Sequence, residues 1–109
     1  SGLMFADGIR LSGLELLAAN HVEESMPLCF ELMGIERWGK KDRINRCLKA
    51  LTLYGGAAKP MIPVLLDLEK QLENHSEAKS LEAIIAQVGE VIAEIEADEN
   101  PPELRSIKE

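Results

Sequence analysis

The stretch MIPVLLDL at residues 61–68 follows the pattern of SMPLCFEL at residues 25–32, which lies 36 residues earlier. Each copy has proline at its third position, an acidic residue at its seventh and apolar residues at most of the others. Because apolar side chains recur at spacings of three and four, each copy predicts one amphipathic helix. These two segments decide the fold, since they show that the chain repeats a helical unit.

Each of these helices follows another helix that also repeats. Gly13-Leu14-x-x-Leu17 matches Cys47-Leu48-x-x-Leu51 at an offset of 34 residues, and Leu81 restarts the pattern 33 residues after Leu48. A period of 33 to 36 residues that holds two helices is typical of an α-solenoid, in which each pair buries its apolar side on the next. We therefore expect an all-α fold, an α-α superhelix of about five helices, with two helical pairs followed by one long C-terminal capping helix.

Three prolines indicate where the second helix of each pair begins. The first four amides of a helix have no acceptor within the helix, so a proline there removes no hydrogen bond. If the second helices start near Glu23 and Lys59, Pro27, Pro60 and Pro63 all fall within a first turn.

The ends of the first and last helices are predicted from capping residues and prolines. Asp7 is the expected N-cap of the first helix, and Ser76 that of the last, whose apolar stripe reaches Ile95. Because Pro101-Pro102 disfavours helix before it, we assign residues 1–98 to a single helical repeat domain and residues 99–109 to a polar tail. We expect an extended, mobile tail unless Leu104 or Ile107 docks on a neighbouring element.

The charge of the chain bears on its partners. A net charge of −7 argues against a general nucleic-acid binder, because phosphate neutralisation needs a basic surface. The distribution is uneven: residues 36–49 carry six basic against two acidic side chains, and residues 67–99 carry ten acidic against two basic. Two interpretations stay open, namely solvated helix faces or a charge layout that orients a partner.

No segment is apolar over enough residues to predict a membrane span, and we find no signal peptide pattern. The chain begins with Ser1-Gly2, from which we expect an excised piece of a larger protein. Cys29 and Cys47 fall on apolar faces, so we expect buried thiols, with a disulfide as the alternative.

The side-chain inventory does not predict an enzyme, a cofactor site or a metal site. His21 and His75 are far apart in sequence, and two cysteines without histidines at ligand spacing do not predict a zinc site. Gly55-Gly56 lacks the lysine and serine or threonine of a phosphate-binding loop, so we interpret it as a turn.

One loop is the best candidate for binding a partner. Trp38 lies there between Arg37 and Lys40-Lys41, and tryptophan beside arginine is common at the energetic centre of protein interfaces. The alternative is that Trp38 covers the stack between the two repeats. If it is exposed, the candidate partner-binding residues are Trp38, Arg37, Lys40, Lys41 and Arg43, suited to an acidic protein.

The run from Leu48 through Gly55-Gly56 to Pro60-Met61-Ile62-Pro63 resembles HEAT-like repeats of the armadillo type, and the resemblance covers residues 9 to about 96. A first helix with Leu-x-x-Leu, a short turn, and a second helix opening with an apolar residue and proline carry it. Residues 37–59 also resemble segments of large uncharacterised bacterial proteins that are often exported. That looser resemblance implies an exported or periplasmic parent.

The sequence thus leads to three functional hypotheses. The first is a protein–protein interaction or scaffolding module, with the second helices exposing residues such as Glu23, Glu31, Lys59, Asp67 and Lys70. The alternative is an accessory domain that packs on the catalytic domain of an exported bacterial enzyme. A weaker third is nucleic-acid binding through residues 37–49. The expected partner is a protein, either another domain of the parent chain or a separate molecule, rather than a nucleic acid or a membrane.

Overall fold

The computed structural model describes residues 2–35 and 39–108 of the 109-residue chain. These residues form five α-helices and two 3-10 segments, so the all-α prediction is confirmed. In chain order the elements are α1 (Gly2–Ala19), α2 (Ser25–Leu32), α3 (Lys40–Thr52), η1 (Gly55–Met61), α4 (Ile62–Glu73), η2 (Ala78–Leu81) and α5 (Glu82–Ala97).

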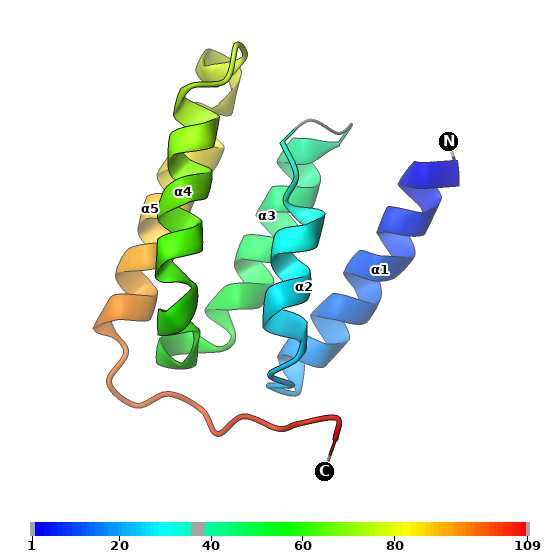
Figure 1. Cartoon of the computed structure of the whole chain (residues 1–109), viewed down its shortest axis with the longest axis vertical. Helices are drawn as coiled ribbons and strands as arrows, with labels where there is room; N and C mark the ends of the chain where they lie inside the picture. The colour runs from blue at the N-terminus through cyan, green and yellow to red at the C-terminus, as the bar shows by residue number, and fades with distance from the viewer. Residues whose placement is uncertain (1, 36–38, 109) are drawn as a thin grey trace.

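The helices lie in two rows (Figure 1). One row holds α1, α3 and α5, and the other holds α2 and α4 in front of it. Helix α3 is central, because it packs against α1, α2 and α5, while α4 packs mainly against α5 and η1. The molecule is flat, with extents of 42 × 34 × 16 Å, which fits two layers of helices.

The core follows from the amphipathic pattern of α3. Its apolar residues Ile44, Cys47, Leu48 and Leu51 recur at spacings of three and four and are all fully buried. Tyr54 follows α3, is equally buried, and donates its hydroxyl to the carbonyl oxygen of Val22 at 2.6 Å. Residues from every other helix complete one continuous cluster around α3.

The structure corrects several predicted boundaries. Pro27 and Pro63 do lie in the first turns of α2 and α4, but Pro60 lies inside the separate 3-10 segment η1. Asp7 is not an N-cap, because α1 begins at Gly2. Ser76 is not one either, because η2 intervenes before α5 begins at Glu82.

Gly55 and Gly56, at the start of η1, contact Asp98, the residue that follows α5. Gly55 has a left-handed φ of 51°, which an L side chain rarely adopts. The amide of Gly56 donates to the carboxylate of Asp98 at 2.7 Å, and this hydrogen bond is the main cause that lowers the pKa of Asp98. A Cβ atom on Gly56 would meet the backbone oxygen of Asp98, so only glycine fits without movement.

The tail crosses back beneath the helices from the end of α5 to the turn between α1 and α2 (Figure 1). The amide of Arg105 donates to the His21 carbonyl at 2.9 Å, and the amide of Glu23 donates to the Arg105 carbonyl at 2.8 Å. Leu104 packs on the core, whereas Ile107 is exposed. The tail is extended as predicted, and Leu104 is the docking residue.

We predict that the Glu24 carboxylate holds the end of this tail. It accepts hydrogen bonds from the Ser106 hydroxyl at 2.6 Å and the Ile107 amide at 3.1 Å, which lower the pKa of Glu24. A lowered pKa means that the contribution is present above the unfolded pKa and is lost as pH falls through the folded value. Glu24→Ala should therefore speed amide hydrogen exchange at Ile107, and acidification should shift the Ile107 amide resonance with a midpoint below the ordinary glutamate value. Glu23→Ala, which leaves these bonds intact, is the control, and equal exchange rates in the two variants would refute the assignment.

Candidate interaction surface

The predicted basic patch is only partly within the described residues. Arg37 and Trp38 lie outside them, so the prediction for these two stays a prediction. Lys41 is exposed at the start of α3, and Lys40 forms an ion pair with Glu77 at 3.0 Å. The hydrogen bond from Lys40 is the main cause that lowers the pKa of Glu77. Lys40 is thus engaged by the segment before α5.

Arg43 does not belong to this patch, and that part of the prediction is wrong. Its side chain is only 3% exposed, and its guanidinium donates to the carbonyl oxygens of Leu32 and, at 3.1 Å, Gly34. The last carbonyls of a helix lack partners within the helix, and a cation there also complements the helix dipole. Arg43 therefore caps the C-terminal end of α2 rather than binding a partner.

The five polar residues expected at the surface of the second helices are all exposed: Glu23, Glu31, Lys59, Asp67 and Lys70. Two of them lie outside those helices, however, since Glu23 precedes α2 and Lys59 is part of η1. Between them lie apolar side chains at matching positions of the repeat, with Leu28 40% and Val64 43% exposed. The outer face of α2 and α4 is therefore mixed rather than purely charged.

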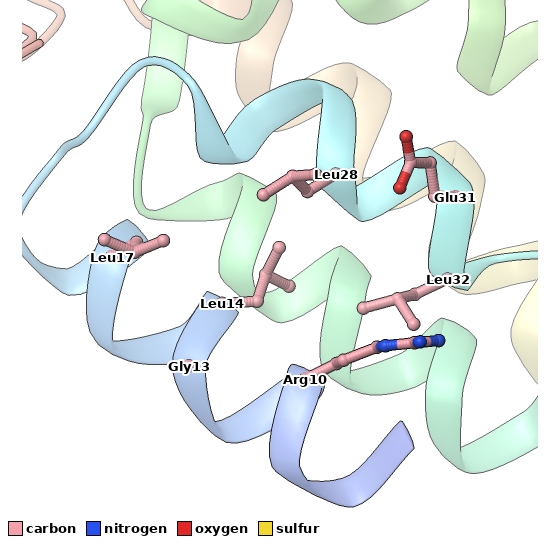
Figure 2. Close-up of a pocket in the computed structure, with 7 residues that line it drawn as sticks. All are labelled: Arg10, Gly13, Leu14, Leu17, Leu28, Glu31 and Leu32. Carbon is pink, nitrogen blue, oxygen red and sulfur yellow. The ribbon is translucent and has the colours of Figure 1, made fainter. Parts of the chain in front are cut away.

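A groove lined mainly by leucines lies between α1 and α2 (Figure 2). Its volume is about 480 Å³. Leucines from both helices project into the space between them, with Arg10 and Glu31 toward one end. The lining residues are Arg10, Gly13, Leu14, Leu17, Leu28, Glu31 and Leu32.

This groove faces away from α3. On α1, Glu15 points toward α3, where it pairs with Arg46, while the groove residues Gly13 and Leu17 lie on another side of the helix. On α2, Cys29 and Ser25 face α3, while Leu28 lines the groove. The groove is thus the outer side of the first helical pair.

Two large apolar side chains of α1 that do not line the groove are also exposed. Ile9 is 60% exposed and Leu16 is 66% exposed. They are seven residues apart, so they share one face of α1 with Gly13 nearby. Contiguous exposed apolar surface of this kind marks sites that bind other proteins or ligands.

A second hollow of about 530 Å³ lies at the C-terminal end of α4, beside Ile35 and His75. It is lined mostly by polar side chains of both charges, including Asp67 and Lys70. Because such groups are well solvated when left open, this hollow carries less drive to bind a protein than the leucine-lined groove.

The two cysteines have no place in a site. Both are buried and free, so the buried-thiol prediction is confirmed. Burial raises the pKa of each thiol to about 12, aided at Cys29 by the neighbouring Cys47. In the described residues, no cluster of three or more His, Cys, Asp or Glu side chains is placed to hold a metal ion.

We predict that these thiols are unreactive in the folded protein. The thiolate is the nucleophile, and both burial and the raised pKa keep its population low. At neutral pH, Ellman's reagent should label the native protein more than about a hundredfold more slowly than the urea-unfolded protein. Fast labelling of one thiol without urea would show that α2 or α3 opens locally.

None of the described helices is long and apolar enough to cross a bilayer. No family model, curated protein or solved structure matches the chain. The groove and the internal repeat are the features of the chain that bear on its function.

Sequence reasoning missed the groove, although a signal for it was present. The apolar face predicted for the first helix consists of Leu11, Leu14, Leu17 and Ala18, all of which are buried except Leu17, which is half-buried. Ile9 and Leu16 form a second apolar stripe on a different side of the same helix. A helix with two apolar stripes in a two-layer fold indicates contact on two sides.

Proposed function

We propose that the chain is a protein-interaction or scaffolding module built from HEAT-like helical pairs, and that it binds its partner through the α1–α2 groove. The internal repeat and the two rows of helices support the solenoid interpretation. The observation that carries the binding site is the leucine-lined groove with Ile9, Leu16 and Leu28 exposed beside it.

The energetics favour a protein as occupant. Burial of apolar surface contributes about 25 cal/mol per Å², and a fully buried leucine or isoleucine contributes about 2 kcal/mol. Leu28 is exposed in the groove, Ile9 and Leu16 are exposed elsewhere on α1, and Arg10 and Glu31 supply opposite charges at the groove rim. An apolar centre with a polar rim is the ordinary anatomy of a protein interface.

The test is a comparison of two leucine variants. Leu28 in the groove is 40% exposed, and Leu53, at the end of α3 and outside the groove, is 46% exposed. Because both side chains reach solvent, Leu28→Glu and Leu53→Glu should both fold. With a photo-crosslinker at Leu16, the partner captured from the native source should be lost in Leu28→Glu and kept in Leu53→Glu. Equal capture in both variants would refute the groove as the binding site, and no capture by the wild type would refute a separate partner protein.

A second candidate is the accessory domain that packs on a catalytic domain. The position of the groove favours it, because the groove lies on the outer side of the first pair, at one end of the row. A linked domain seated there would protect α1 amides from hydrogen exchange in a longer parent protein and leave no separate partner to capture. The nucleic-acid alternative loses support, because Arg43 is buried and Lys40 is paired with Glu77.

A further inference from the structure

The packing of α2 on α3 shows what kind of surface covers such a helical face. The two helices run antiparallel and meet at three levels. Ser25 hydrogen-bonds the Tyr54 hydroxyl, Cys29 lies near Cys47, and the Leu32 carbonyl accepts from Arg43. Between these levels Ile44, Leu48 and Leu51 of α3 are fully buried.

Each of the three residues in or just after α3 that contact α2 has a counterpart 34 residues earlier, in or just after α1. Tyr54, Cys47 and Arg43 correspond to Asn20, Gly13 and Ile9, respectively. None of the three is covered: Asn20 is exposed, Ile9 is 60% exposed, and a Cβ atom on Gly13 would find nothing within 4 Å. The face of α3 that α2 covers therefore has an open counterpart on α1.

We propose that the occupant of the α1–α2 groove is an amphipathic α-helix of the same chemistry as α2, lying antiparallel to α1. This inference rests on the proposed function and names its partner class. The contact stripe of such a helix carries small or medium side chains at spacings of three and four, as α2 does with Ser25, Met26, Cys29 and Leu32.

Gly13 determines how closely the incoming helix can approach α1. Cys47, its counterpart on α3, is fully buried by the helices around it. A glycine at the same level leaves more room, so the incoming helix can approach α1 closely or place a larger side chain there. Arg10, where α3 has Ile44, lies toward one end of the groove.

The experiment supplies such a helix in cis. A second copy of residues 1–39 is fused ahead of residues 6–109, because Ala6 corresponds to Lys40 in the repeat. The α2 of the added copy can then reach the α1 that follows the junction, as α2 reaches α3 in the 109-residue chain. If the groove takes this helix, the thermal midpoint should rise by about 5 °C or more relative to the 109-residue chain. Amide exchange at Leu16 and Leu17 should slow at least about tenfold, as expected for newly protected helical amides.

Gly8 and Gly13 provide matched variants in the same helix. A Cβ atom meets nothing within 4 Å at either position, so a side chain can leave the backbone at both without a clash at its Cβ atom. Only Gly13 lines the groove. In the fusion, both substitutions are made in the α1 that follows the junction. There Gly13→Arg should abolish the gain in thermal midpoint and in amide protection, while Gly8→Arg should keep both.

Three outcomes would overturn the inference: a fusion without the rise in midpoint and protection, equal effects of the two arginine variants, or a 109-residue chain that sediments as a dimer dissolved by Gly13→Arg. The last would make a second copy the occupant.

Failure of the proposed function gives a different result. If the fusion packs but no partner is captured by crosslinking, the helix inference stands and the interaction role does not. If a partner is captured but the fusion does not pack, the partner presents something other than such a helix.

Discussion

Arg43→Ala is expected to lower the free energy of unfolding by about 3 kcal/mol, because it removes two charge-assisted hydrogen bonds and leaves buried carbonyl groups without a donor. The acceptors are the Leu32 and Gly34 carbonyls at the end of α2. Urea unfolding followed by circular dichroism measures the change. The loss should appear as an earlier midpoint with an unchanged slope, since the same surface is exposed on unfolding.

Arg46→Ala is the matched control on the same helix. The Arg46 side chain is 28% exposed and pairs with Glu15, and such solvent-exposed pairs contribute at most about 1 kcal/mol. A difference of about 2 kcal/mol or more between the two variants would support the capping role. Similar losses in the two variants would contradict the capping role of Arg43.

Gly56→Ala is expected to cost about 3 kcal/mol, the upper range for inserting a methyl group into packed structure. The new Cβ atom would meet the backbone oxygen of Asp98, so the end of α5 must move away from η1. That movement also weakens the 2.7 Å hydrogen bond from the Gly56 amide to the Asp98 carboxylate. Chemical denaturation of the purified variant measures the loss.

Gly89→Ala should have the opposite sign. Gly89 lies inside α5, where alanine is favoured over glycine by about 1 kcal/mol. A Cβ atom there would make an ordinary contact of 3.6 Å with the Glu69 side chain. Stabilisation by Gly89→Ala together with destabilisation by Gly56→Ala would separate close packing from helix propensity. Two losses of similar size would contradict the packing described at Asp98.

The features that the sequence predicted well are local ones. The proline positions placed the start of α2 within two residues, near Glu23 against Ser25, because a proline fits where its amide is not needed. They placed the start of α4 three residues early, near Lys59 against Ile62, because Pro60 belongs to η1. The apolar spacing identified the faces of α3 and α5 that are buried. Capping residues predicted less well, since Asp7 and Ser76 are each compatible with several positions near a helix start and their side chains alone do not choose among them.

The candidate surface was harder to predict because it depends on which helices meet. Arg43 was placed on the surface from its charge, although it lies four residues before Cys47 and therefore on the buried face of α3. Its acceptors are carbonyls of α2, which no spacing within α3 reveals. The docking of the tail rests largely on backbone hydrogen bonds, which any residue type can make, so composition could not predict it.

The path of the tail affects how the molecule unfolds. An array of helical pairs with free ends loses its terminal pieces first, because each piece contacts only its neighbour. Here the segment around Arg105 ties the turn that follows the first helix to the end of the last one. The tail cannot leave without breaking its hydrogen bonds to the turn after α1, so the first and last helices are linked by more than the helices between them. We expect one cooperative unfolding transition in place of stepwise loss from the ends.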